Sequence, residues 1–541
     1  MAADEQTFDY VIAGAGSAGC VVANRLSEDP SMTVALLEAG PPDRSPFIHI
    51  PLGLVRAMVD PKINWMFFGA PQENLGNRQV FMPRGKTLGG SSSINGMVYV
   101  RGHPLDYDDW AKAGNPGWAW TDVKRYFLKS EHNEQFGGTE HHGTGGPLNV
   151  TFIKTPSKLE RDFVAAAESL QYRENKDFNG DTQDGFGIHQ VTQKNGRRWS
   201  TAKAYLGPAT NRKNLAVITN AAVARVALDG RRAVGVVVRN GSAERTIRAR
   251  REVILCAGAL TTPKLLMLSG IGNGEDLKSY GIATVHHLPG VGRNHQDHAA
   301  IHAQMKTKSR IPYGFSVETF PKFAWWAAEY LVNRSGLFSS NMVESGGFVR
   351  TRRDLDRPDI QFVFTPGYRA RAPKIIGYGH GYMMTSVLLR PKSRGEVRLA
   401  GPDPYAPPVI KANFFGEGED LDVLMRGLKE SRRILHADAF RKYEPMELLP
   451  GNEVQKDDDL RAYIRANSAT IFHPVGTCKM GSDEMAVVDT RLRVHGIEGL
   501  RVVDASIMPT ICGGNTNAPT IMIGEKASDL IKEDSRQKAA A

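Results

Sequence analysis

Three glycines near the N-terminus stand at the spacing Gly-x-Gly-x-x-Gly, directly after a mostly apolar segment at 8–13. They are Gly14, Gly16 and Gly19. In a strand–loop–helix unit, the first glycine permits a tight turn, the second lets the backbone approach a phosphate, and the third lets the helix pack on the strand. The N-terminus of that helix favours negative charge. We therefore predict a βαβ unit that holds the pyrophosphate of a dinucleotide.

The residues that follow the loop support the same interpretation. Segment 21–26 has helical spacing, and the apolar segment 33–37 indicates a second buried strand that ends at Glu38. A carboxylate about 20 residues past the glycines can accept hydrogen bonds from ribose hydroxyls. The neighbouring residues Ser17, Ala18 and Ala39 belong to the same predicted site. NAD and FAD both suit it at this point.

Length and composition exclude several classes of protein. With 541 residues, 41% of them hydrophobic, the chain is long enough for two or more buried cores. The excess of basic residues gives a net charge of +10, but no basic stripe interleaved with aromatic residues indicates nucleic-acid binding. We expect neither a disulfide framework nor a metal site, because the cysteines are far apart. They are Cys20, Cys256, Cys478 and Cys512.

Neither a targeting segment nor a membrane-spanning segment is visible. Residues 1–5 lack the basic-then-apolar order of a signal peptide, and no run of about 18 apolar residues predicts a spanning helix. We expect a cytoplasmic protein, with peripheral association with the inner face of the cytoplasmic membrane as an alternative. The tryptophan-containing segment 323–331 suits a membrane interface, although a helix packed on its own domain is the simpler interpretation.

The middle of the chain predicts a strand meander inside the dinucleotide fold. Turns at Asp229-Gly230 and Asn240-Gly241 separate the short apolar segments. Such an insertion is more typical of FAD-binding proteins than of NAD dehydrogenases. The predicted strands are 216–219, 223–228, 233–238 and 252–256.

A second, substrate-facing part is richer in aromatic residues and prolines. It includes a predicted strand at 360–364 and predicted helices at 323–332 and 421–435. Its aromatic content, together with Phe472, favours an apolar pocket over one that suits sugars. Glu344 could steady a cation, although an exposed or capping glutamate is the simpler interpretation. No feature of the sequence predicts the oligomeric state.

Four separated blocks resemble the signatures of the glucose/methanol/choline (GMC) family of FAD enzymes. The first is the N-terminal glycine loop already described. Together with segment 82–86, the blocks are most similar to bacterial alcohol, choline and polyether-alcohol dehydrogenases. The other blocks are 85–97, 258–272, and a C-terminal group at 473–477, 502–506 and 514–520.

This resemblance implies an α/β fold with α+β insertions. One domain is Rossmann-like and binds FAD through discontinuous segments, and the other is a substrate domain built on an antiparallel sheet with helices. The implied FAD-binding segments are 1–155, 211–300 and 466–541. The implied substrate-binding segments are 156–210 and 301–465.

The resemblance also assigns residues to the cofactor. Gly89 and Gly90 let the backbone run close to the diphosphate and the flavin. The segment beyond them, Asn95 to Val98 with Gly96 and Met97, passes the flavin ring. Val223 and Ala257 bracket the adenosine, and Asp504 and Ala505 approach the diphosphate and the ribityl chain. Asn515 and Thr516 complete the implied cofactor-binding residues.

His473 is the predicted catalytic base, because it alone stands in the His-Pro-Val-Gly-Thr context of the family. A neutral imidazole can accept the proton of an alcohol, and burial helps to keep it neutral. Asn515 matches the second catalytic position, where its amide could stabilise the developing alkoxide, and Asn517 is the alternative by register. Other histidines lack that context: His103, His141, His142, His189, His295 and His298.

The implied reaction is oxidation of a primary alcohol to an aldehyde. His473 takes the hydroxyl proton, FAD takes the hydride, and the electrons pass to a quinone or another carrier. An oxidase that uses O₂ and releases H₂O₂ and an FAD-containing non-redox lyase are the alternatives. Some relatives attach FAD covalently through a histidine where this chain has Ile94, so we expect non-covalent FAD.

Overall fold

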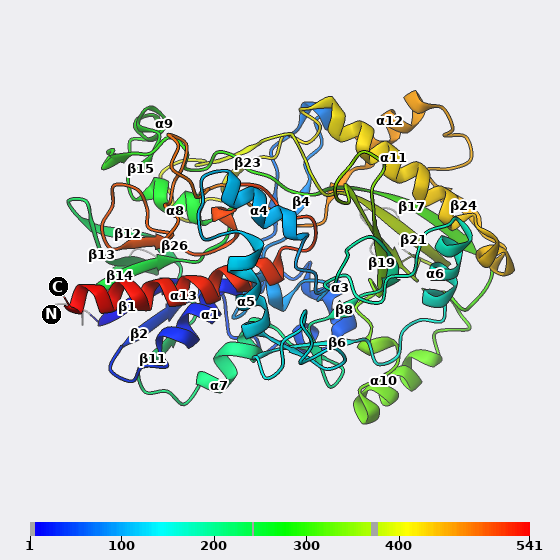
Figure 1. Cartoon of the computed structure of the whole chain (residues 1–541), viewed down its shortest axis with the longest axis horizontal. Coiled ribbons are helices and arrows are strands. Elements are labelled where there is room, and N and C mark those ends of the chain that lie inside the picture. Colours follow the sequence, from blue (N-terminus) through cyan, green and yellow to red (C-terminus); the bar gives the residue numbers. More distant parts are fainter. Residues whose placement is uncertain (1–5, 241–242, 369–376, 541) are drawn as a thin grey trace.

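The computed structural model describes residues 6–240, 243–368 and 377–540. Two large sheets lie toward opposite ends of the long axis of the molecule, and both described ends of the chain lie beside the first sheet (Figure 1). Residues 1–5, where we expect no signal peptide, lie outside the described residues. So does Gly241 of the predicted Asn240-Gly241 turn.

The first sheet has seven strands in the order β11-β2-β1-β14-β13-β12, with β26 paired to β14. Strands β11, β2, β1, β14 and β26 are parallel to one another, whereas β14, β13 and β12 form an antiparallel meander. Their bounds are β1 Thr7–Ala13, β2 Val34–Leu37, β11 Leu215–Ile218, β12 Val223–Asp229, β13 Arg232–Asn240, β14 Ala243–Leu255 and β26 Leu500–Val502.

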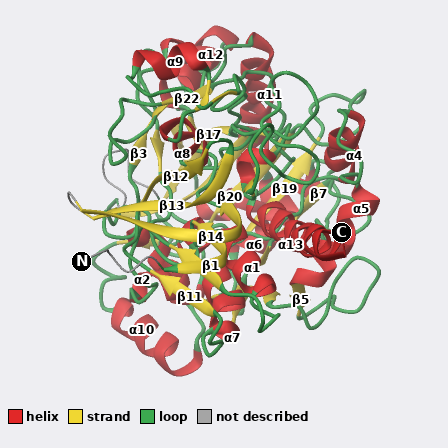
Figure 2. Ribbon diagram, turned by 90° about the vertical axis from the view of Figure 1, so that its left-hand side faces the viewer, coloured by secondary structure: helices red, strands yellow, loops and turns green. Residues whose placement is uncertain are grey.

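The predicted βαβ unit is confirmed, and so are the last three strands of the predicted meander. The predicted strand at 216–219 forms β11, which pairs in parallel with β2 at the opposite edge of the sheet and is not part of the meander. Strand β14 also differs, because it begins nine residues before the predicted 252–256 segment. Its first half is rich in charged residues and so lacks an apolar signal, but it pairs with β13 along its length. The two strands extend from the sheet as a long arm (Figure 2).

Two helices pack together on the first sheet, α1 (Ser17–Leu26) and α13 (Asn517–Ala540). Gly19 brings α1 close to the glycine loop, since a Cβ at this position would lie 1.9 Å from the Gly14 carbonyl oxygen. Ion pairs from Arg501 and Arg491 to Asp534 hold the C-terminal part of α13.

The second sheet has eight strands in the order β24-β17-β21-β20-β19-β7, with β18 paired to β21 and β25 paired to β17. Every pair in it is antiparallel. Its strands are β7 Gly185–Ile188, β17 Ala299–Thr307, β18 Gly314–Phe315, β19 Ser345–Val349, β20 Ile360–Thr365, β21 Gly379–Leu388, β24 Met446–Leu449 and β25 Ala469–Thr470.

Helices α11 (Gly418–Leu435) and α6 (Leu159–Ser169) cover this sheet (Figure 1). The spacing of apolar residues in α11 explains the packing, because its buried residues recur every three or four positions. The predicted strand at 360–364 and the predicted helix at 421–435 are confirmed as β20 and α11.

Smaller elements connect the two sheets. The remaining helices are α2 Pro46–His49, α3 Leu54–Ala57, α4 Pro104–Lys112, α5 Trp120–Ser130, α7 Gly207–Ala209, α8 Thr262–Leu268, α9 Gly274–Ser279, α10 Lys322–Asn333 and α12 Asp457–Asn467. The remaining strands are β3 Phe67–Phe68, β4 Phe81–Met82, β5 Glu131–Asn133, β6 Leu148–Phe152, β8 Gln190–Val191, β9 Gln193–Lys194, β10 Arg197–Arg198, β15 Ile271–Gly272, β16 His286–His287, β22 Glu396–Arg398 and β23 Val409–Lys411.

Two connections cross the predicted domain limits. Residues Ala202–Leu206 pack on α1 beside the first sheet, and β25 joins the second sheet. The exact boundaries between the two domains stay a prediction. The two sheets themselves have the predicted architecture.

Helix α10 forms at the tryptophan-containing segment and packs through one face only. Tyr330 is its one buried residue, whereas the exposed fraction of Trp325 is 70%. The helix lies at the edge of the molecule in both ribbon views (Figures 1 and 2). Among the described helices, none combines the length and the apolar character that crossing a bilayer requires.

Candidate active site

A cavity of about 1930 Å³ is lined by residues from both sheets. The end of β1 and the loop after β14 contribute from the first sheet, and β17, β20 and β21 contribute from the second. Small-molecule sites commonly measure about 300–1,000 Å³. This cavity therefore has room for a large cofactor together with a substrate.

Two glycine-rich segments meet at the first-sheet end of the cavity. A Cβ at Gly90 would lie 2.7 Å from the Gly16 Cα, and Gly14, at φ +107°, could not carry a Cβ without touching the Cys256 carbonyl oxygen at 2.5 Å. The Gly89 amide donates to the Ala15 carbonyl at 2.8 Å and joins the two segments. Because these glycines carry no side chain, a phosphate can come close to the backbone at the N-terminus of α1.

Nearly all of the predicted cofactor residues line this cavity. Gly19 and Gly89 do not: the first lies under the loop against Gly14, and the second faces the side chain of Ser93. These two therefore shape the site without lining it. The predicted residues that do line it are Gly14, Gly16, Ser17, Ala18, Glu38, Ala39, Gly90, Asn95, Gly96, Met97, Val98, Val223, Ala257, Asp504, Ala505, Asn515 and Thr516.

Glu38 directly follows β2 and lines the cavity. Its carboxylate accepts hydrogen bonds from the amides of Ala15 and Gly40, at 3.1 and 2.9 Å. Burial raises its pKa to about 7, against the effect of those two amides. Two oxygens offer about four acceptor positions, so the side chain can still accept a ribose hydroxyl.

Asp504 fixes the loop on the opposite side of this end. Its Oδ2 accepts the Gly258 amide at 2.8 Å and the Thr262 hydroxyl at 2.6 Å. Gly258 has a φ of +82°, and a Cβ there would meet no atom within 4 Å. The open space beside Gly258 and the tight contact of Gly16 with Gly90 together fit a dinucleotide that runs along the cradle.

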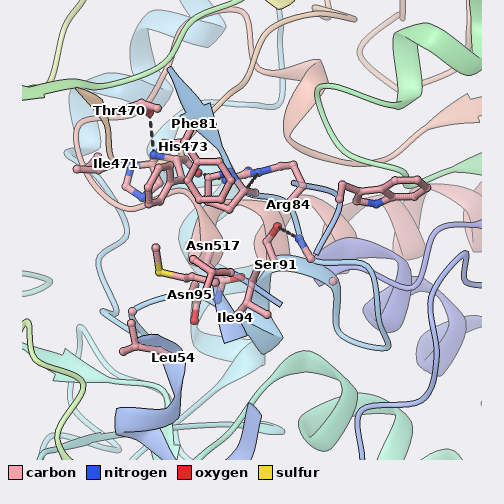
Figure 3. A pocket seen from close by; sticks show the side chains of 18 of the residues that line it. Leu54, Phe81, Arg84, Ser91, Ile94, Asn95, Thr470, Ile471, His473 and Asn517 are labelled. Atoms are coloured by element: carbon pink, nitrogen blue, oxygen red, sulfur yellow. Dashed lines mark hydrogen bonds between the residues drawn. The ribbon is translucent and has the colours of Figure 1, made fainter. Parts of the chain in front are cut away.

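His473 follows β25 and lines the other part of the cavity, near Phe81 and Arg84 and across from Ile94, Asn95 and Asn517 (Figure 3). Its backbone amide donates to Asp297 Oδ1 at 2.8 Å. Burial, followed by the nearby imidazole of His298 and guanidinium of Arg84, lowers the pKa of His473 well below 6.5. The imidazole is therefore neutral at physiological pH.

Asn515 contacts the His473 ring, whereas Asn517 lies across the cavity from it (Figure 3). The Asn515 amide nitrogen lies 3.3 Å from His473 Nε2. Asn517 begins α13 and accepts a hydrogen bond from the Ser17 hydroxyl at 2.7 Å. Of the two alternatives, Asn515 is the one that contacts the His473 ring, and its catalytic role stays a prediction.

Two residues at this site were missed by the sequence-based site prediction. Arg84 donates to the carbonyl oxygen of Phe472, and burial lowers its pKa to about 10. His298 lies with its Nδ1 3.0 Å from His473 Nδ1. The similarity at 82–86 was a signal for Arg84, whereas no local pattern distinguished His298 from the other histidines.

Glu344 lies outside the cavity and is fully buried. Its carboxylate accepts hydrogen bonds from the Ser157 amide at 2.6 Å and from the Ser340 hydroxyl. Burial, followed by the nearby charge of Glu344, raises the pKa of the equally buried Glu160. The expectation of an exposed glutamate at 344 is therefore wrong, and Glu344 is not among the described residues that line the cavity.

The fold and this site define a dinucleotide-binding oxidoreductase with a second, substrate-facing sheet. Residues 8–300 and 391–524 match the N-terminal and C-terminal models of the GMC oxidoreductase family. The chain belongs to the GMC oxidoreductase family. The suspected resemblance, the fold class and the assignment as an oxidoreductase are thereby confirmed, and the family implies FAD as cofactor.

Curated relatives align along almost the whole chain. An alcohol dehydrogenase [acceptor] of Pseudomonas putida is 47% identical over 526 residues, covering 97% of this chain and 95% of the relative. An oxygen-dependent choline dehydrogenase of Brucella anthropi is 44% identical, with the same coverage of both chains.

Solved structures share the fold. Pyridoxine 4-oxidase from "Mesorbium loti" is 31% identical with a TM-score of 0.87, covering 96% of this chain and 98% of that one. A formate oxidase variant from Aspergillus oryzae is 28% identical with a TM-score of 0.91, covering 99% of this chain and 100% of that one.

Proposed function

We propose that this protein oxidises a primary alcohol to an aldehyde, with FAD as the hydride acceptor and a quinone or another carrier as the final electron acceptor. The observation that carries this proposal is the pair of His473 and Asn515 at the wall of a largely apolar cavity. The curated relatives named as alcohol and choline dehydrogenases support the same class of reaction.

His473 would act as the general base. An alcohol hydroxyl does not ionise by itself at neutral pH, and a neutral imidazole within hydrogen-bond reach can take its proton. Asn515 would donate its amide hydrogen to the substrate oxygen as negative charge develops there. FAD, when bound, supplies the acceptor for the carbinol hydride.

The cofactor would be bound without a covalent bond to Ile94. This side chain is 3% exposed and belongs to a small apolar cluster with Ile48, Ala57 and Ile63. An aliphatic side chain offers no nucleophile to a flavin. The glycine cradle, Glu38 and Asp504 would hold FAD through hydrogen bonds and packing.

The lining favours a neutral alcohol over a cationic one. Among the described residues that line the cavity, Glu38 and Asp504 are the only acids, and both belong to the dinucleotide end. Near His473, the charged side chain is that of Arg84, and Phe81 and Phe472 pack edge-to-face at 6.3 Å. A quaternary ammonium group would meet the positive charge of Arg84 there, and no acid of the described lining lies at that end to offset it.

Helix α10 supports an association with an anionic membrane surface. Of the exposed residues of this helix, all of which the structure describes, Lys322 alone is charged. Clustered tryptophan and aliphatic side chains suit the bilayer interface, and a lysine suits anionic lipids. Phe315 and Phe323 beside this face also line the cavity, so an apolar alcohol could enter from the membrane.

An anaerobic survey of alcohols tests the function. Aliphatic, aromatic and polyether alcohols should bleach the oxidised flavin absorbance, and choline should do so more slowly. Repeating the survey with O₂ and with a quinone-like dye identifies the acceptor, because H₂O₂ formed at the rate of alcohol turnover would favour an oxidase. No bleaching by any alcohol would reject the proposal and favour a non-redox reaction such as a lyase.

A further inference from the structure

The ring nitrogens of His473 belong to a series of hydrogen bonds in which each donor and each acceptor can be assigned. The series begins at the Leu389 carbonyl oxygen, which lies 3.2 Å from His298 Nε2. A carbonyl oxygen only accepts hydrogen bonds. His298 Nε2 therefore carries a hydrogen and donates it to Leu389.

His298 is neutral, because burial lowers its pKa to about 3. A neutral imidazole has one N–H, and that hydrogen is already on Nε2. His298 Nδ1 is therefore a bare acceptor. It lies 3.0 Å from His473 Nδ1, and two bare nitrogens at this distance would repel each other.

We infer that His298 is a positioning residue that fixes the tautomer of His473, with the hydrogen on Nδ1 and a bare Nε2 beside Asn515. This inference rests on the proposed role of His473 as the base. Neutral histidine in water prefers the opposite tautomer, and which nitrogen is protonated in a protein depends on the partner of the other. Without the His298 acceptor, the hydrogen would lose its partner at Nδ1, and the nitrogen that must receive the substrate proton would be free to carry it.

The hydrogen bonds on the Nε2 side of His473 indicate the same tautomer. The Gln361 amide nitrogen donates to Asn515 Oδ1 at 3.3 Å. This contact turns the Asn515 amide nitrogen toward His473 Nε2, at 3.3 Å. An N–H donor facing Nε2 requires a bare nitrogen there, so both ends of the series demand the same tautomer.

Asp297 aligns the two imidazoles. Its Oδ1 accepts the backbone amides of His298 and His473, both at 2.8 Å. The two rings lie edge-to-face, with centroids 5.3 Å apart and planes at 81°. One carboxylate thus holds the two histidine backbones in register, and the ring contact follows from that arrangement.

The direct test is ¹⁵N NMR of the FAD-loaded protein labelled at histidine, without any alcohol. Protonated and bare ring nitrogens have widely separated ¹⁵N shifts, and a His473→Gln spectrum assigns the signals. We expect a protonated Nδ1 and a bare Nε2 on His473. A hydrogen on Nε2 would overturn the inference, and this result needs no variant of His298 to fold.

Two variants of His298 separate its hydrogen-bonding role from its packing. His298→Phe keeps a ring but removes the acceptor, so the His473 hydrogen should move to Nε2 and flavin reduction by alcohol should slow about 10- to 100-fold. His298→Asn returns an acceptor oxygen near the position of Nδ1 and should restore the tautomer and part of the rate. An unchanged tautomer in His298→Phe would overturn the inference.

His295→Phe is the matched control. His295 is equally buried in the same segment, and neither of its ring nitrogens has a hydrogen-bond partner among the described residues. Its replacement should leave the His473 tautomer unchanged and alter the rate less than about twofold, well below the effect of losing a general base. If no alcohol bleaches the flavin, the proposed function fails, whereas the tautomer spectrum still decides the present inference.

Discussion

At the scale of single residues, the site owes its chemistry to burial. Desolvation lowers the pKa of His473 and of His298, so both imidazoles are neutral where a proton acceptor is needed. Arg84 adds a positive charge that opposes protonation of His473. Each of these effects depends on side chains that only the fold brings together.

His473→Ala should leave FAD bound, because the imidazole lies at the substrate end of the cavity. Flavin reduction by alcohol should slow about 100-fold or more, the usual contribution of a general base. Anaerobic stopped-flow absorbance measures this rate, and Asn517→Ala serves as a comparison at a neighbouring cavity position. Unchanged bleaching would remove His473 from the proposed role.

The rate of flavin reduction should depend little on pH around 6.5. The pKa of His473 in the folded protein lies well below 6.5, so the imidazole stays neutral and active as the pH falls through that value. The rate should decline only at lower pH, where the ring becomes protonated. A half-maximal rate near pH 6.5 would contradict the lowered pKa.

At the scale of elements, loops that follow strands form the cofactor end of the cavity. Helix α10 contributes Phe323 to the cavity lining. The loop after β1 meets the segment that contains Gly90, and the loop after β14 is fixed by Asp504. Helix α10 instead presents an apolar face outward. Trp325, Leu331 and Val332 of this helix have exposed fractions between 68% and 80%, and Val317 and Phe320 in the segment just before it are similarly exposed.

Gly90→Ala should weaken FAD retention. The added Cβ would lie 2.7 Å from the Gly16 Cα, so two backbone segments would have to separate. Overpacking of this kind typically costs about 1–3 kcal/mol of unfolding free energy. The ratio of flavin to protein absorbance after gel filtration measures retention. Gly418→Ala is the control, since its Cβ would meet nothing within 4 Å, and equal retention in both variants would contradict the close contact.

Trp325→Ser with Leu331→Ser should weaken binding to vesicles that contain phosphatidylglycerol. Removing two exposed apolar side chains loses roughly 1.5–3 kcal/mol for each one that the bilayer buries, so the affinity should fall at least about tenfold. Co-sedimentation measures the bound fraction. Met446→Ser with Met485→Ser removes exposed apolar residues elsewhere and should bind like the unchanged protein. Equal binding of both double variants, or none by the unchanged protein, would reject a membrane role for α10.

At the scale of the whole molecule, the cofactor site is assembled from segments that are hundreds of residues apart. Gly14 and Asn515 line one cavity, and β26 near the C-terminus pairs with β14 in the first sheet. The cavity wall opposite them comes from the second sheet. FAD would therefore bind the folded chain and not the unfolded one.

Bound FAD should raise the melting temperature of the protein, and unfolding should release it. A ligand at 100 times its Kd stabilises the folded state by about 2.7 kcal/mol when it binds only that state. Differential scanning fluorimetry with and without added FAD measures the shift. After acid precipitation the flavin should stay in the supernatant, because Ile94 cannot form a covalent bond to it. Flavin that sediments with the protein would contradict non-covalent binding.

Local sequence patterns predicted the glycine loop, the acid after the second strand, most of the strand meander and the histidine in its short motif. These features have local signals, because backbone turns and alternating burial depend on neighbouring residues. Only the tertiary structure decided that Asn515 and not Asn517 reaches His473, and that His298, 175 residues earlier, faces the same ring. Such contacts depend on how the two sheets and their loops pack. The spacing of residues along the chain does not give the distance between side chains that meet only after folding.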